Sequence, residues 1–248
     1  MKRAGVGLLA FVLACGSSSE EGVAARTVAS LATSPPSEVG EKVALDVVVV
    51  VSQQNGKKWR AYVQDPGQPN GIGLFCDAGA ATPCTATRMP NGARGTLDSL
   101  WSPQPASKLE PVSWASQGAG VVTYANVSTK TALTSASGTP VRLTGGPWTV
   151  TDTTSDAMKN PGWVSGDCAS GPPRFGVEVT DESDGTKLSV MLKWFDAVAI
   201  TTDDSACGAG KKVLANGQRF VKLGGLVEAT GFGSVALEPF SDTDWTIR

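Results

Sequence analysis

The chain has 248 residues with 21 basic and 23 acidic side chains, giving a formal net charge of −2 at pH 7. This balance lacks the positive surplus of a typical nucleic-acid-binding protein, so no nucleic-acid partner is expected. The sequence contains no histidine, which excludes Ser-His-Asp and Cys-His catalysis and most catalytic zinc sites, and no catalytic residue, metal ion or cofactor is predicted.

Residues 1–14 are predicted to form a signal peptide. Lys2 and Arg3 precede an uncharged run over residues 4–14 that is rich in leucine and valine. As a helix this run would span only about 16 Å, roughly half of a membrane core, so it is too short to be a transmembrane anchor. Small residues follow at once, beginning with Cys15 and Gly16.

The motif Val12-Leu13-Ala14-Cys15 resembles the lipobox of bacterial lipoproteins. The resemblance implies that the chain is cut before Cys15, that its thiol is acylated, and that the membrane is a partner through this anchor. Because Gly16 rather than aspartate follows the cysteine, it also implies sorting to the outer membrane. Cleavage removes two basic residues and no acidic one, so the net charge becomes −4. The alternative is an ordinary cleaved signal peptide with an incidental cysteine.

Residues 15–40 are predicted to be a flexible tether, because small and polar residues dominate and Pro35-Pro36 would interrupt a helix. The rest is predicted to be all-β, since its 29 glycines and 15 prolines favour turns over helices. We expect two β-rich domains, over residues 41–137 and 138–248.

The first domain opens with a strongly β-branched stretch from residue 42. Val47–Val51 is apolar at every position, which predicts a strand covered on both faces. In "KKWRAYVQD" the apolar residues Trp59, Ala61 and Val63 alternate with polar ones, which is typical of a half-buried strand. Residues 77–118 show little pattern apart from a predicted short helix at 96–101.

The second domain shows clearer alternation. "RFGVEVTD" places Phe175, Val177 and Val179 on one face, and "TKLSVMLKWF" does the same for Leu188, Val190, Leu192 and Trp194. The hairpin "RFGVEVTDESDGTKLSVMLKWF" followed by "NGQRFVKLGGLVEATGFGSVALEP" resembles strands 2–3 and 4–5 of an OB-fold. "WRAYVQDPGQPNGIGLF" resembles the equivalent hairpin of a first OB-like unit. The resemblance implies one or two small Greek-key barrels.

The cysteines other than Cys15 are even in number, and in an exported protein they are expected to form disulfides. We predict the pairs Cys76–Cys84 and Cys168–Cys207, each within its own domain. A zinc site built from the four thiolates is the alternative, but no pair has C-x2-C spacing.

A polar row on the predicted outer face of one strand is the candidate binding site, and it consists of Lys58, Arg60, Tyr62 and Gln64. In an OB-fold the outer face of strands 2–3 binds the ligand, so the resemblance implies a platform for a glycan or protein partner in the envelope. A solvated strand face is the simpler interpretation.

Function is predicted as a lipid-anchored, non-enzymatic binding or assembly module. Two alternatives stay open. One is a purely structural envelope protein whose partner covers the valine strand. The other is a carboxylate-dependent glycan hydrolase or its substrate-targeting subunit, with acids drawn from Asp152/Asp156, Asp181/Glu182/Asp184, Asp203/Asp204 or Asp242/Asp244. Because nearly all of these acids lie at predicted turns, local structural roles are favoured.

Overall fold

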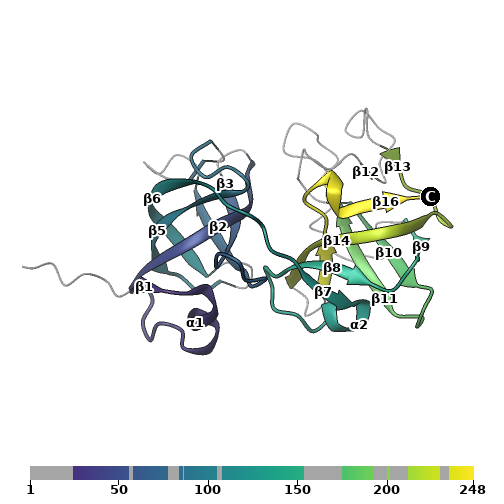
Figure 1. The fold of residues 1–248 in the computed structure, drawn as a ribbon, viewed down its shortest axis with the longest axis horizontal. Helices are drawn as coiled ribbons and strands as arrows, with labels where there is room; N and C mark the ends of the chain where they lie inside the picture. The colour runs from purple at the N-terminus through teal and green to yellow at the C-terminus, as the bar shows by residue number, and fades with distance from the viewer. Residues whose placement is uncertain are drawn as a thin grey trace, which may run out of the picture.

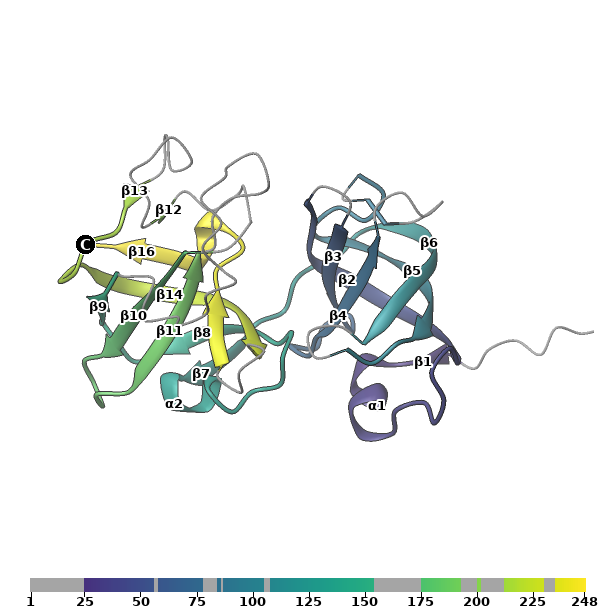
Figure 2. The ribbon, with the colours of Figure 1, turned by 180° about the vertical axis from the view of Figure 1, so that it is seen from behind.

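The protein is nearly all β, and its strands form two barrels that lie side by side (Figures 1 and 2). The two barrels are joined by residues 120–124. The computed structural model describes residues 25–55, 58–77, 84–85, 87–104, 108–153, 175–192, 200–201, 212–229 and 235–248.

Five described strands close the first barrel in the order β2-β3-β4-β6-β5, and β5 pairs back onto β2. The β4–β6 pair is parallel and the other neighbours are antiparallel. This is the Greek-key order of an OB-fold, so the first unit is complete. Its elements are β1 (Ala25–Arg26), α1 (Val28–Thr33), β2 (Lys42–Asn55), β3 (Lys58–Gln64), β4 (Ile72–Asp77), β5 (Ala93–Trp101) and β6 (Leu109–Ala119).

Strands β5 and β6 occupy much of the stretch in which the sequence showed little pattern. The short helix predicted at 96–101 is wrong, because these residues lie in β5 and alternate between buried and more exposed positions. Gly95 and Ser99 take two of the inward positions, so the apolar periodicity is weak in the sequence. Gly95 is required there, because a Cβ atom would lie 2.4 Å from the Ala115 carbonyl oxygen.

The predicted flexible tether over residues 15–40 is corrected from Ala25 onward. β1 pairs in parallel with β2, and α1 begins at a capping box in which Thr27 Oγ1 accepts a hydrogen bond from the Ser30 amide at 2.9 Å. Val28 and Leu31 on α1 are buried in the core of the first barrel. This segment is therefore an integral part of that barrel.

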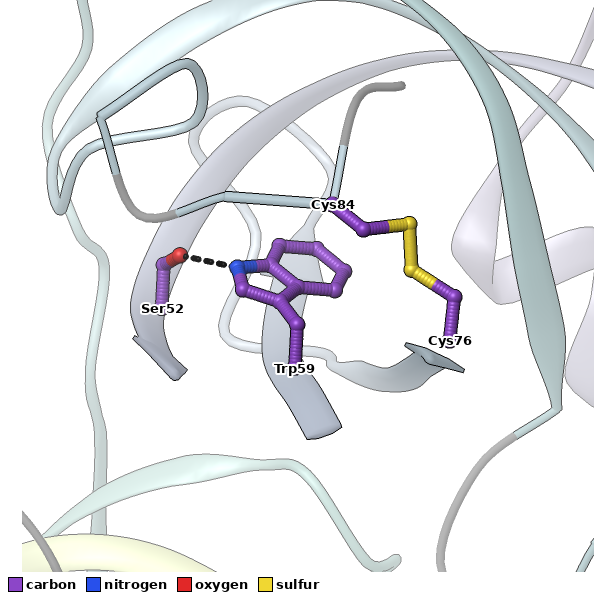
Figure 3. Close-up of a disulfide and its surroundings, with 4 residues drawn as sticks. All are labelled: Ser52, Trp59, Cys76 and Cys84. Atoms are coloured by element: carbon purple, nitrogen blue, oxygen red, sulfur yellow. Dashed lines mark hydrogen bonds between the residues drawn. A yellow bond between two sulfur atoms is a disulfide. The ribbon is translucent and has the colours of Figure 1, made fainter. Parts of the chain in front are cut away.

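The core of the first barrel confirms the predicted inward face of β3, since Trp59, Ala61 and Val63 are all buried. The predicted disulfide Cys76–Cys84 is also confirmed, with 6.3 Å between the Cα atoms, and it lies beside Trp59 (Figure 3). The Trp59 indole Nε1 donates a hydrogen bond to Ser52 Oγ at 3.0 Å. Cys15 and the predicted pair Cys168–Cys207 lie outside the described residues.

The second barrel repeats the topology of the first. Its closed ring runs β9-β10-β11-β15-β14, with β14 pairing back onto β9 and with β11 parallel to β15. β8, β7 and β16 extend the sheet from β14. The elements are β7 (Ala125–Ser128), α2 (Thr129–Ala132), β8 (Pro140–Thr144), β9 (Trp148–Asp152), β10 (Phe175–Asp181), β11 (Lys187–Leu192), β12 (Ile200–Thr201), β13 (Lys212–Val213), β14 (Arg219–Ala229), β15 (Val235–Glu238), the 3-10 helix η4 (Asp242–Asp244) and β16 (Trp245–Ile247).

The second barrel confirms one prediction made from the sequence and corrects another. Its hairpin alternation is confirmed, because Val177, Val179, Leu188 and Val190 are all buried in its core. The predicted domain boundary at residue 138 is corrected, since β7 pairs with β8 and Ala132 of α2 belongs to the second core. The second unit therefore begins directly after the linker.

Candidate binding site

The polar row predicted on β3 lies on the outer face of the first barrel, as the alternation required, but the second barrel covers Arg60 and Tyr62 and the linker covers Gln64. Tyr62 is 2% exposed and Gln64 is fully buried. Arg60 is half-buried, and Lys58 lies at the start of β3 in register with Asp77 of β4. Tyr62 and Gln64 are therefore not open to an external ligand.

Arg60 connects the two barrels through an ion pair. Its guanidinium group bonds the carboxylate of Glu228 on β14 and donates a hydrogen bond to the Tyr62 hydroxyl. Burial alone would lower the pKa of Arg60, but neighbouring Tyr62 and Glu228 raise it above its ordinary value. Burial likewise raises the pKa of the Tyr62 phenol, which keeps it protonated. A charged bridge thus crosses the contact between the barrels.

An apolar cluster surrounds this bridge. Val50, Val51 and Tyr62 of the first barrel pack with Leu226 and Phe240 of the second. The register of β2 against β3 shifts between Val49 and Val51, and both Val50 and Val51 enter this cluster. Val47–Val51 is buried at every position, which confirms the predicted two-sided cover. The second barrel of the same chain supplies part of that cover, so the valine strand gives no reason to expect a separate structural partner.

Gln64 fixes the linker to the first barrel. Its side-chain Nε2 donates a hydrogen bond to the Thr123 carbonyl at 3.2 Å, and its Oε1 accepts one from the Thr123 amide at 3.2 Å. The side-chain amide therefore pairs with the linker backbone as a neighbouring strand would. A buried amide needs such partners, because leaving them unmade costs the full desolvation penalty. The polar character of Gln64 therefore serves the linker.

Tyr124, the next linker residue, is held by the second barrel. Its ring stacks on Phe240 at 5.8 Å between centroids, and the Arg142 guanidinium lies 4.3 Å from the centre of the same ring. The hydroxyl donates to Asp244 Oδ1 at 3.0 Å. Burial raises the pKa of Asp244, although the Phe240 and Ser241 amides also donate to this carboxylate. Asp244 thus caps this turn and anchors the Tyr124 hydroxyl.

The equivalent face of the second barrel is partly exposed among the described residues. We define the β9–β11 face as Thr151 of β9, Glu178 and Thr180 of β10, and Lys187 of β11. Lys187 Nζ bonds Glu178 Oε1 at 2.8 Å, and Thr151 Oγ1 donates to the same carboxylate oxygen at 3.2 Å. The Lys187 side chain is 66% exposed, and this hydrogen bond raises its pKa. Hydroxyl groups and one ion pair therefore lie at the surface on the strands that bind ligands in OB-folds.

Sequence reasoning did not select the β9–β11 face. The alternation in "RFGVEVTD" indicated that Glu178 and Thr180 share a side, but the same pattern marked the β3 row, which also carries an aromatic residue. Nothing in a single strand distinguishes a face that meets solvent from one that meets a second domain. Only the packing of the two barrels separates these cases.

Asp181, another candidate acid, has a structural role. It is 1% exposed, and its carboxylate accepts hydrogen bonds from Ser183 Oγ at 2.6 Å, from Thr129 Oγ1 at 2.6 Å, from the Ser183 amide at 2.9 Å and from the Gly146 amide at 3.2 Å. Burial alone would raise its pKa, but these hydrogen bonds hold the pKa below its usual value. Asp184 accepts from the Thr186 amide at 2.8 Å within the same turn.

Asp181 and Asp244, the two candidate acids with buried carboxylates, thus lie in separate turns. Among the residues that the structure describes, no group of three or more histidine, cysteine or acidic side chains is placed to hold a metal ion. The candidates Asp156, Asp203 and Asp204 lie outside the described residues.

The lowered pKa of Asp181 predicts a pH dependence. The carboxylate should stabilise the fold fully above its ordinary pKa of 3.8, and this contribution should be lost as the pH falls through the lower value of the folded state. Asp181→Asn is expected to lower the free energy of unfolding by about 2–3 kcal/mol at pH 6. Urea unfolding of both proteins between pH 6 and 2.5 should show this gap narrowing in acid. Asp184→Asn in the exposed turn is the control, and a gap that is constant with pH would contradict the prediction.

Within the described part of the chain, no helix has the length and apolar character needed to span a membrane. The chain matches no protein-family model and no curated protein.

Several solved structures are distantly similar. The murine DNA-binding protein bound with double-stranded DNA is 12% identical with a TM-score of 0.35, over 83% of this chain and 94% of that one. The tetrameric p202 HIN2 structure is 10% identical with a TM-score of 0.33, over 85% and 95%. A protein described as an aspartyl-tRNA synthetase from Leishmania major Friedlin is 15% identical with a TM-score of 0.31, and the match spans 44% of this chain and 23% of that one. Similarities this distant carry no argument about function.

Proposed function

We propose that this protein is a lipid-anchored, non-enzymatic binding module of the cell envelope, held at the outer membrane through Cys15. The lipobox-like motif supports the anchor. The Cys76–Cys84 disulfide supports an oxidising compartment, because such bonds persist mainly in exported proteins. In this proposal the chain folds outside the cytoplasm and holds its two barrels near the membrane surface.

We further propose that the β9–β11 face binds the partner. The observation that carries this is the contrast between the barrels in the described part of the chain: Arg60, Tyr62 and Gln64 of the first are covered, while the matching face of the second is partly exposed. Thr151 and Thr180 offer hydroxyl groups, and Glu178 and Lys187 offer one charge of each sign. A face without a positive surplus suits a neutral, hydroxyl-rich ligand such as an envelope glycan better than a polyanion.

A glycan-array screen of the full chain carrying Cys15→Ser, followed by titration calorimetry with the glycans that bind, tests this site. The double change Glu178→Gln and Lys187→Met should weaken binding at least tenfold, because both ends of the exposed ion pair lose their charge. Lys130→Met, an exposed substitution on α2 of the same barrel, is the matched control. Unchanged affinity in the double variant would place the site elsewhere.

The anchor has its own test. Cys15→Ser removes the thiol that would be acylated, so the protein should move from the membrane fraction to the soluble fraction of the envelope. Cell fractionation with quantitative immunoblotting measures this shift, and Cys76→Ser, which leaves the motif intact, controls for a general loss of cysteine. Continued membrane retention of the Cys15→Ser protein would contradict acylation at this position.

A further inference from the structure

A cleft of about 380 Å³ lies where α1 crosses the first barrel, next to a loop of the second barrel. Its apolar floor consists of Val28, Leu31, Ile72 and Trp101, all of which are buried. Ala32 on α1 and Ala136 of the second barrel are exposed at its rim. The volume lies at the lower end of the range of small-molecule sites, which runs from about 300 to 1,000 Å³.

The α1 wall of this cleft is fixed in place. The carboxylate of Asp65, in the turn after β3, accepts hydrogen bonds from the Val28 amide at 2.7 Å and the Ala29 amide at 3.0 Å. Asn70 Nδ2 donates to the same carboxylate at 2.6 Å. These bonds occupy the first free amides of α1 and hold the helix against the barrel. The wall is therefore formed before any ligand arrives.

The opposite wall is fixed by a backbone contact between the barrels. A Cβ atom at Gly71 would lie 1.8 Å from the Gly138 carbonyl oxygen, so the two backbones touch there. The Gly138 amide donates to the Val227 carbonyl at 2.7 Å, and Ser137 Oγ accepts from the Ala229 amide at 3.3 Å. The loop that carries Ala136 and Ser137 is thus tied to β14.

Among the described residues that line this cleft, Lys108 is the ionisable one. Its backbone amide donates to the Gly73 carbonyl at 2.9 Å, which places it at the start of β6 next to β4. The structure shows no ion pair for Lys108 with any other described residue. A single cation beside an apolar floor offers two complementary surfaces, one for an apolar chain and one for an anionic head group.

We propose that this cleft binds a small amphipathic anion, with its apolar chain on the floor formed by Val28, Leu31, Ile72 and Trp101 and its carboxylate at Lys108. The cleft holds the liquid volume of about a dozen water molecules, so a ligand of about that many heavy atoms fits. Because the second barrel contributes Ala136 and Ser137, the ligand would contact both barrels. This site is separate from the β9–β11 face and does not depend on the function proposed for it.

Decanoate is the probe, and decanol and decyltrimethylammonium are its uncharged and cationic counterparts. Titration calorimetry with the full chain carrying Cys15→Ser should show saturable binding of decanoate, weaker binding of decanol and none of the cation. Lys108→Met should weaken decanoate binding about fivefold to tenfold and leave decanol unchanged, because only the charge contact is lost. Ala32→Trp should block both, and Lys130→Met on the exposed face of α2 should change neither.

Amide and indole signals in 15N NMR spectra locate the ligand. Decanoate should shift the Trp101 indole and the Gly71 and Gly73 amides, which lie at the cleft, and should not shift residues of the β9–β11 face. Absence of saturable binding, or decanoate binding that Lys108→Met leaves unchanged, would overturn the proposal. Loss of glycan binding in the β9–β11 variants together with normal decanoate binding would separate the two sites.

Discussion

Arg60→Met is expected to lower the free energy of unfolding by about 3 kcal/mol. The change removes the guanidinium group that bonds Glu228 and Tyr62, while Glu228 and Glu238 stay 3% and 1% exposed beside the substituted position. Removing one partner of a buried pair is costly, because the remaining carboxylate keeps its desolvation penalty and loses the attraction of the guanidinium group. Chemical denaturation monitored by circular dichroism measures the loss.

Arg94→Met is the matched control for this substitution. Arg94 also forms an ion pair, with Asp46 at 2.8 Å, but these side chains are 44% and 46% exposed. Exposed pairs contribute about 0–1 kcal/mol, so the same chemical change should have little effect there. Equal losses in the two variants would show that the Arg60 bridge contributes no more than a surface pair.

Gly71→Ala is expected to disturb the contact between the two barrels. Its Cβ would lie 1.8 Å from the carbonyl oxygen and 2.5 Å from the carbonyl carbon of Gly138. Both are backbone atoms, so no side-chain rotation relieves the overlap, and the loop must move. We expect a loss of about 3 kcal/mol and faster hydrogen exchange of the Gly138 amide, which bonds the Val227 carbonyl.

Gly67→Ala separates this steric effect from the general cost of replacing a glycine. Gly67 lies in the turn before β4, has a positive φ of 74° and has no atom within 4 Å of an added Cβ. The Gly67→Ala variant should therefore lose only about 1 kcal/mol of unfolding free energy, from the backbone strain of that conformation. Hydrogen exchange of the Gly138 amide should stay normal. Protected exchange at Gly138 in Gly71→Ala would contradict the proposed close approach of the barrels.

Alternation was informative wherever one face of a strand met a core and its residues were large. It located the inward face of β3 at Trp59, Ala61 and Val63 and that of β10 at Val177 and Val179. It failed for β5, where Gly95 and Ser99 occupy inward positions. The β6 backbone leaves no room for a side chain at Gly95. Because neither Gly95 nor Ser99 is apolar and large, the alternation of the strand is hidden in the sequence. Close packing of this kind involves residues distant in sequence, so the local pattern does not contain it.

The prediction of a flexible tether over residues 15–40 was wrong from Ala25 onward for a related reason. The small and polar residues of this segment are typical of a tether, yet Asp65 holds the start of α1 from a turn more than thirty residues away. For the polar row on β3, the sequence correctly predicted that Arg60, Tyr62 and Gln64 share one side of the strand. It did not predict their partners, because a polar contact between two domains has the same composition as a solvated surface.

The linker has a practical consequence for dissecting this protein. Thr123 is held by Gln64 of the first barrel, whereas Tyr124 is held by Asp244 and Phe240 of the second. Expressing either barrel alone, by dividing the chain within this linker, would expose the apolar residues that pack between the barrels. These are Val50 and Val51 in the first and Leu226 and Phe240 in the second. We expect such fragments to aggregate. The tandem, and not the single barrel, is accordingly the smallest piece that we expect to behave well when expressed in isolation.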